Sequence, residues 1–152
     1  MRLTQHFSLE ELTASQVAAR NGLDNEPDEE TLWRLRRLAA YLERVREALH
    51  SHPIIVTSGY RSPEVNRLVG GSPRSAHMRG LAADIIAPTF GTPLQVAERI
   101  VEELLPFDQL IHEYGRWVHF AIGEGPEDGW RREMLTKCRA MPYRRGLHPC
   151  SS

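Results

Sequence analysis

The sequence predicts an α+β fold, a small antiparallel sheet with helices from the N-terminal part of the chain packed on it. Two observations support this class. Helical periodicity dominates residues 8–49, and short β-branched or alternating runs separated by turns dominate the second half of the chain. Helices grouped before a run of strands are typical of α+β proteins. The length of 152 residues suits one domain, so we expect a single domain over residues 1–152.

Two helices are expected before the first strand. Ser8 and Glu11 can form a capping box, which predicts an N-terminal helix within residues 1–22 that ends near Gly22. Asp28 can cap a second and longer helix. Apolar residues spaced by three and four positions give this second helix one buried face. They are Leu32, Leu35, Leu38, Ala39, Leu42, Val45 and Leu49.

After residue 53 the pattern changes to strands separated by short helices. The β-branched run at 54–57 predicts a buried strand. Ser62-Pro63 and Thr92-Pro93 each give an N-cap followed by a proline at the first helical position. Further strands are expected at 81–86, 108–113, 117–122 and 130–137. Residues 138–152 are expected to form an irregular tail.

Charge and hydropathy exclude two classes of partner. Lysine and arginine total 19 against 20 acidic residues, for a formal net charge of −1. Such a balanced chain has no overall positive field for nucleic acid. No apolar run approaches the roughly 18 residues that a membrane-spanning helix needs. We therefore expect no nucleic-acid partner, no membrane insertion and a monomer.

The N-terminus and the cysteines bear on localisation. Residues 1–12 carry charges where a signal peptide has its apolar stretch, so we expect no signal peptide and a cytoplasmic location at synthesis. The two cysteines, Cys138 and Cys150, are too few to form a disulfide framework for the fold. The sequence leaves open whether they pair.

Two of the seven histidines could lie close to an aspartate in the folded chain. His77 ends a loop, Asp84 lies on the strand that follows, and His119 lies on a later strand. Zinc favours imidazole nitrogen and carboxylate oxygen, and a catalytic zinc keeps three protein ligands and one water. The three residues are therefore candidate ligands for one zinc ion. Taken alone, a buried aspartate satisfied by backbone amides, beside two unrelated histidines, would give the same sequence.

A longer set of motifs resembles a known family. These motifs are Ser58-Gly59-Tyr60-Arg61-Ser62-Pro63-Glu64-Val65-Asn66, Val69-Gly70-Gly71-Ser72, Ser75-x-His77-x-x-Gly80-x-Ala82-x-Asp84 and Trp117-Val118-His119. Together they resemble the zinc D-alanyl-D-alanine carboxypeptidases, a family that includes bacterial and phage murein peptidases. The resemblance implies a Hedgehog-like α+β fold with one zinc per chain, held by His77, Asp84 and His119. It also implies hydrolysis of a peptide bond in the peptidoglycan stem peptide.

The chain departs from this pattern at the general base. Many members of the wider group carry an acidic base three residues before the last histidine ligand, where this chain has Arg116. An arginine cannot accept a proton in water. The nearby acid is Glu113, which resembles a branch of the family that carries its acid further upstream.

The length of one turn decides between two candidate bases. Cross-strand partners share a face of the sheet, so a three-residue turn at 114–116 places Glu113 on the face of His119. A two-residue turn, Gly115-Arg116, would instead place His112 opposite His119. The glycine favours the second turn and the resemblance favours the first. We predict Glu113 as the base.

Four further residues are candidates for substrate binding. Arg61 follows a strand, and its planar fork suits a C-terminal carboxylate or a developing oxyanion. The alternative for Arg61 is a structural role, with hydrogen bonds to the backbone carbonyls of its turn. Ser75 can contact substrate or brace the loop of His77. Trp117 is expected to flank the cleft or cover the sheet. His112 is expected to make a further contact with the substrate.

The sequence thus predicts a zinc metallopeptidase acting on peptidoglycan stem peptides, either a D-Ala-D-Ala carboxypeptidase or an endolysin-type endopeptidase. Without an export signal, a phage or prophage lysin released through a separate pore, or a virion-associated enzyme, is expected. The alternative is a non-catalytic cell-wall-binding or phage structural protein that retains the zinc fold.

Overall fold

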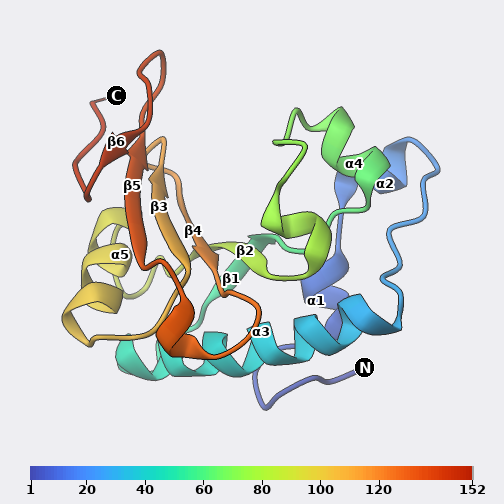
Figure 1. Cartoon of the computed structure of the whole chain (residues 1–152), viewed down its shortest axis with the longest axis horizontal. Coiled ribbons are helices and arrows are strands. Elements are labelled where there is room, and N and C mark those ends of the chain that lie inside the picture. Colours follow the sequence, from blue (N-terminus) through green and yellow to red (C-terminus); the bar gives the residue numbers. More distant parts are fainter. Residues whose placement is uncertain (152) are drawn as a thin grey trace.

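Six strands form one sheet in the order β1-β2-β4-β3-β5-β6. The structure, a computed structural model, describes residues 1–151 (Figure 1). The strands are β1 (Ile55–Ser58), β2 (Ala82–Ile86), β3 (Gln109–Glu113), β4 (Trp117–Ala121), β5 (Glu133–Lys137) and β6 (Arg144–Arg145). The helices are α1 (Leu9–Thr13), α2 (Gln16–Arg20), α3 (Glu29–Ala48), α4 (Pro63–Leu68) and α5 (Pro93–Glu102), with short 3₁₀ helices η1 (Ala76–Arg79) and η2 (Glu127–Gly129). The predicted α+β class is confirmed.

One strand pair differs from the predicted antiparallel sheet. β5 runs parallel to β3, while the other neighbouring strands are antiparallel. Both edges of β4 are already paired, with β2 and β3, so β5 cannot pair with β4, and it adds at the outer edge of β3. The connection from β4 to β5 stays at the end of the sheet where β3 also begins, as Figure 1 shows. β5 therefore runs in the direction of β3.

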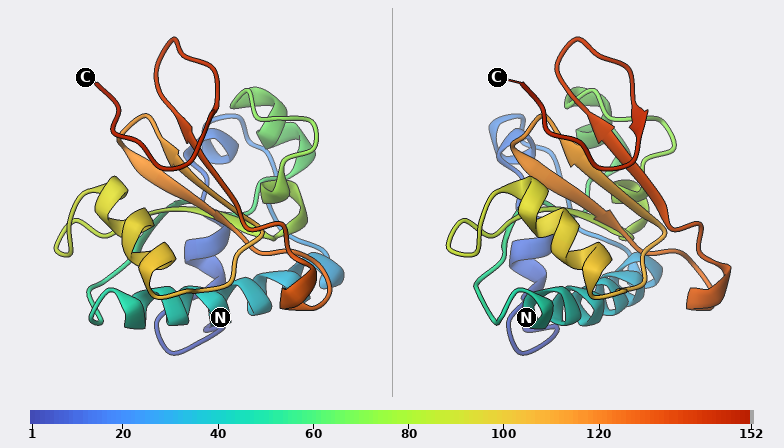
Figure 2. Two further views of the ribbon diagram at one scale, coloured as in Figure 1. Left: turned by 60° about the vertical axis from the view of Figure 1, so that its left-hand side comes forward. Right: turned by 90° about the vertical axis from the view of Figure 1, so that its left-hand side faces the viewer.

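Helices α3 and α5 pack against one face of the sheet and form the core with it. Figure 2 shows α5 across this face with α3 below it. Alternation along the strands decides which residues enter the core. Leu110 of β3, with Val118 and Phe120 of β4, is fully buried there. α3 and α5 contribute the other fully buried side chains of this layer, including Leu35, Leu38, Leu42, Val96 and Ile100. The opposite face of the sheet is left for α4, η1 and a cleft.

The N-terminal segment is two short helices rather than the single helix predicted within residues 1–22. α1 ends at Thr13, and Ala14 is extended. Ser15 then accepts a hydrogen bond from the backbone N–H of Ala18 and starts α2. A serine that caps a new helix competes with continuation of the old one, which explains the break.

The last residues are more ordered than the irregular tail that the sequence suggested. β6 pairs with β5, and Thr136 Oγ1 donates to the Gly146 carbonyl at 2.8 Å. A disulfide joins Cys138 to Cys150, which answers the question that the sequence left open. The C-terminal segment is therefore fixed along β5. Within the part of the chain that the structure describes, no helix combines the length and apolar character needed to cross a bilayer.

Candidate metal centre

Three side chains from three elements converge on one point. His77 comes from η1, Asp84 from β2, and His119 from β4, where it lies directly opposite Asp84. Asp84 Oδ1 is 3.2 Å from His77 Nε2 and 3.2 Å from His119 Nδ1, and the two nitrogens are also 3.2 Å apart. All three residues are buried. The structure thus brings together the three predicted ligands.

The donor set fits a zinc ion. Four ligands arranged tetrahedrally at the usual zinc–nitrogen and zinc–oxygen distances are about 3.3 Å from one another, close to the separations found here. His77 Nδ1 lies 2.8 Å from the Gly59 carbonyl and donates its hydrogen there. Nε2 therefore carries the lone pair that faces the cluster, the usual arrangement for a metal-binding histidine.

Two glycines let the chain place His77. A Cβ on Gly59 would lie 2.3 Å from the Leu12 carbonyl oxygen, so only glycine allows this close approach. Gly80 ends η1 in the left-handed conformation, with φ of 74°, and a Cβ there would be 2.9 Å from Thr31 Cγ2. The chain can thus leave η1 sharply and enter β2, which carries Asp84.

Asp84 is strongly biased toward its ionised form. Burial acts to raise the pKa of this carboxyl, but the charges and hydrogen bonds of His77 and His119 outweigh burial and hold the pKa well below its usual range. The neighbouring strand β1 also contacts Asp84, at a bulge between Val56 and Ser58. There Thr57 Oγ1 donates to the Asp84 carbonyl at 3.2 Å. The carboxylate is thus ionised and ready to bind a cation.

Glu113 lies beside this cluster. β3 and β4 are joined by the three-residue turn, with Glu113 opposite Trp117, so Glu113 shares the face of His119. Glu113 Oε1 is 3.9 Å from His119 Nδ1, and 15% of the Glu113 side chain is exposed. Burial and then the negative charge of Asp84 raise the pKa of Glu113, against the opposing effect of His119. A carboxylate with a raised pKa is a stronger base than a free glutamate, which suits it to accept a proton.

His112 lies on the opposite face of β3. It pairs with Val118, is 2% exposed, and its ring Nδ1 donates to the His148 carbonyl at 2.8 Å. Because side chains alternate along the strand, His112 points away from the cluster of His77, Asp84 and His119, called the metal group below. The substrate contact expected for His112 is therefore corrected to a buried residue that fixes the C-terminal segment.

Arg61 faces the metal group from the other side. Its backbone N–H donates to the His77 carbonyl at 3.1 Å, and its Nη1 donates to Asn66 Oδ1 at 3.3 Å. The guanidinium thus contacts a side-chain amide rather than the turn carbonyls of the structural alternative. Its Nε is buried and has no hydrogen-bond partner among residues 1–151. Burial acts to lower the pKa of Arg61, while Asp84 and Glu113 favour its charged form.

These residues line one cleft of about 880 Å³, within the usual size range of ligand sites. Ser75 and Trp117 also line it. The Ser75 hydroxyl accepts from the His77 backbone N–H at 3.2 Å, so it braces this loop. The Trp117 indole nitrogen is buried without a partner among the described residues. The predicted residues that the structure brings together here are Arg61, Ser75, His77, Asp84, Glu113, Trp117 and His119.

Sequence reasoning assigned no role to two residues that shape the cleft. Asn66 is 3% exposed, accepts from Arg61 and donates to the Ser72 carbonyl at 2.9 Å. Its place within the Arg61 motif was the only signal for it. Tyr143 lines the cleft from the C-terminal segment, and no local pattern indicated that position.

The sequence matches a known protein family. The sequence model of the family described as peptidase M15 matches residues 5–121. The matched range contains the three candidate ligands, Arg61 and Glu113. It ends before β5 and the C-terminal segment. No curated protein matches the chain.

Proposed function

The chain belongs to the peptidase M15 family, and from this premise we propose that it hydrolyses peptide bonds in peptidoglycan stem peptides. Family membership confirms the resemblance found in the motifs and makes the chain a zinc-dependent metallopeptidase. The murein substrate is our proposal. The observation that supports it best is the group of His77, Asp84 and His119 at 3.2 Å, with Glu113 and Arg61 in the same cleft.

His77, Asp84 and His119 are the residues that would hold the zinc ion. When bound, zinc supplies Lewis acidity, which makes a water more acidic and a carbonyl more electrophilic. Two neutral imidazoles and one carboxylate leave a positive charge on such a site, so that acidity is largely preserved.

Glu113 supplies the proton transfers. Its carboxylate accepts a proton from the attacking water, whose oxygen forms the new bond to the scissile carbonyl carbon. The protonated carboxyl then donates to the leaving amine as the carbon–nitrogen bond breaks. The first products are a carboxylic acid and an amine, and Glu113 returns to its starting charge. The acid then gives up its proton, and at neutral pH the products are a carboxylate and an ammonium. Its raised pKa suits both the accepting and the donating step.

Arg61 binds negative charge on the substrate. Arg61 lines the cleft, and Asp84 and Glu113 favour its charged form. Its guanidinium would bind a peptide carboxylate or the oxyanion of the reacting carbonyl. Asn66 holds the guanidinium in place through Nη1.

The non-catalytic alternative rested on Arg116, which occupies the position of the acid in many relatives. Arg116 belongs to the turn after β3 and is exposed. Glu113 instead presents its carboxylate 3.9 Å from His119. An acid beside the metal group can act as the general base, so the cleft supports an enzyme over a binding protein.

The decisive experiment is cleavage of purified stem peptides, followed by mass spectrometry. The parental protein loaded with zinc is expected to release terminal D-alanine or an internal fragment, and the mass of the product identifies the bond. Glu113→Gln is the matched control, since it keeps the cleft and the ligands. Intact stem peptides with the zinc-loaded parental protein would contradict the proposal.

A further inference from the structure

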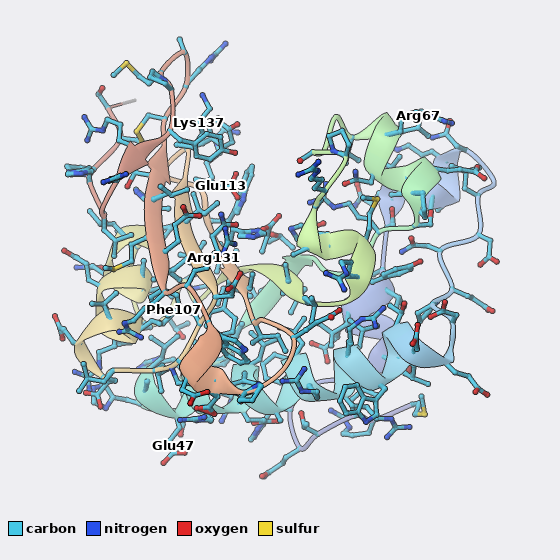
Figure 3. The ribbon with its side chains drawn as sticks, viewed as in Figure 1. Glu47, Arg67, Phe107, Glu113, Arg131 and Lys137 are labelled. Atoms are coloured by element: carbon cyan, nitrogen blue, oxygen red, sulfur yellow. A yellow bond between two sulfur atoms is a disulfide. The ribbon has the colours of Figure 1, made fainter. Side chains whose placement is uncertain are left out.

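The cleft has two walls of different origin. Arg61 and Ser75 lie on the wall formed by α4 and η1, whereas Leu135 and Tyr143 come from β5 and the segment after it. In Figure 3 Glu113 and Lys137 lie on the β5 side of the molecule, and Arg67 marks the position of α4 on the other side. The family match ends at residue 121, so the β5 wall comes from residues outside the shared region.

Tyr143 is held in this wall by its neighbours. Lys137 Nζ lies 5.9 Å from the ring of Tyr143 and 6.0 Å from the ring of Tyr114, within the range of cation–π attraction. The same ammonium donates to the carbonyls of Cys138 and Met141. Since Lys137 pairs with Glu113 in the sheet register, the tyrosine is tied to the strand pair that carries the proposed base.

The segment that presents Tyr143 is closed at both ends. The disulfide between Cys138 and Cys150 brackets it, and the pairing of β6 with β5 follows directly after Tyr143. A residue fixed in this way loses little conformational freedom when it binds a ligand. The wall is therefore preorganised.

The exposed part of Tyr143 faces the site. Tyr143 is 55% exposed and lines the cleft, and its hydroxyl makes no hydrogen bond to another residue in the described range. Burial and then the negative charges of Glu113, Tyr114 and Asp84 raise the pKa of Tyr143. A tyrosine hydroxyl is neutral at pH 7 and can donate a hydrogen bond to a ligand in the cleft, beside an apolar ring surface.

We propose that Tyr143 is a substrate-binding residue, whose ring and hydroxyl contact the peptide on the side of the scissile bond away from Arg61. The inference rests on the proposed function, in which Arg61 binds negative charge at the opposite wall. A peptide that reaches both walls passes over the metal group and Glu113. Because Tyr143 lies outside the family match, this contact sets the substrate preference of this chain separately from the shared chemistry.

The test compares steady-state cleavage of one stem peptide by Tyr143→Ala, Tyr143→Phe and Met141→Ala. Met141 is the matched control, since it is 45% exposed in the same disulfide-closed segment but does not line the cleft. Losing the ring is expected to raise KM roughly tenfold with kcat within about twofold, as for a contact made equally in ground and transition states. Tyr143→Phe should lie between the parental protein and Tyr143→Ala, and Met141→Ala should match the parental protein.

A second readout removes turnover from the measurement. In the Glu113→Gln background, calorimetry should show the same roughly tenfold loss of peptide affinity when Tyr143→Ala is added. Unchanged thermal midpoints and zinc contents would exclude a folding effect. A Tyr143→Ala variant with the KM and affinity of Met141→Ala overturns the inference and leaves the proposed function intact. A parental protein that cleaves no stem peptide overturns both.

Discussion

Glu113 and His112 are adjacent in sequence and lie on opposite faces of β3, which makes them a natural pair of variants. Glu113→Gln keeps the size of the side chain but removes its ability to take a proton. His112→Gln changes a buried ring whose contacts are with the C-terminal segment. The hypothesis that Glu113 is the base therefore predicts a large loss of activity for the first variant and a small one for the second.

The expected size follows from the position of the carboxylate. General-base assistance is typically worth about 10²–10⁴ in rate, or about 2.7–5.4 kcal/mol of transition-state stabilisation. Glu113 is mostly buried, lies 3.9 Å from His119 Nδ1 and has a raised pKa, all of which favour efficient proton transfer. We therefore expect a loss in the upper half of this range, about 10³-fold or more in kcat. His112→Gln should stay within about threefold of the parental rate, because the cleft is unchanged.

The assay is cleavage of a defined stem peptide by zinc-loaded variants, with zinc content measured on the same samples. Both variants should keep their zinc, since neither residue belongs to the three-residue ligand group. An active Glu113→Gln variant beside an inactive His112→Gln variant would refute the assignment of the base. It would also conflict with the three-residue turn, which fixes the facing of both side chains.

Stability of the metal-free protein provides an independent control. The folded state raises the pKa of Glu113, so its charged form is disfavoured by folding. This cost is absent at low pH and develops as pH rises through the pKa of the unfolded chain toward that of the folded one. A neutral glutamine avoids the cost. Metal-free Glu113→Gln should therefore melt at or above the parental midpoint at neutral pH, and a clear drop would indicate a structural role.

Three other changes test the remaining parts of the structure. Arg61→Lys keeps the charge but loses the planar fork, so kcat/KM should fall roughly tenfold or more with zinc content unchanged; parental turnover would make Arg61 structural. Asp84→Asn removes the negative charge between the two imidazoles, so metal analysis after dialysis should find well under one zinc per chain; full occupancy would contradict the ligand set. Replacing Cys138 and Cys150 together by serine releases a loop of 12 residues and should lower the free energy of unfolding by roughly 2–3 kcal/mol in chemical denaturation. An unchanged midpoint would show that the hydrogen bonds of the segment suffice.

Local sequence signals predicted the elements that depend on neighbours in the chain. The capping residues Ser8, Asp28, Ser62 and Thr92 each begin a helix in the structure. His77 and Asp84 could be named because their motif spans a short segment, in which the loop, η1 and β2 follow one another without a break. His119 came from a separate short motif, Trp117-Val118-His119, on β4. A cap or a motif of this kind acts over a few residues and is visible in the sequence.

The turn between β3 and β4 shows why turn propensities in the sequence could not decide between Glu113 and His112 as the base. Its backbone needs positive φ at two successive residues, and Tyr114 supplies one of them with φ of 59° beside Gly115 with φ of 68°. Tyrosine rarely adopts this conformation, so the glycine alone favoured the shorter turn. The pairing of Glu113 with Trp117, a property of the assembled hairpin, imposes the longer turn.

Non-local pairing explains the other differences. β5 cannot pair with β4, whose edges are occupied, and it runs parallel to β3 because the chain returns to the end of the sheet where β3 begins; no residue within 133–137 encodes that constraint. The order of the C-terminal segment depends on β5 in turn, through Thr136 and β6. The place of Tyr143 in the cleft therefore follows from the sheet as a whole, and no local pattern in the sequence indicates it.

The residues around the candidate metal site differ in how firmly they are fixed, which bears on how the site assembles. Asp84, Glu113 and His119 lie on adjacent strands of one sheet, whose register sets their separations. His77 instead depends on a single turn of 3₁₀ helix, held by the Gly59 carbonyl through its ring. Arg61 is tied to this turn because its backbone N–H donates to the His77 carbonyl. A ligand bond to His77 would therefore hold the segment that carries Arg61, so metal binding and placement of the substrate-binding guanidinium are coupled through one backbone hydrogen bond.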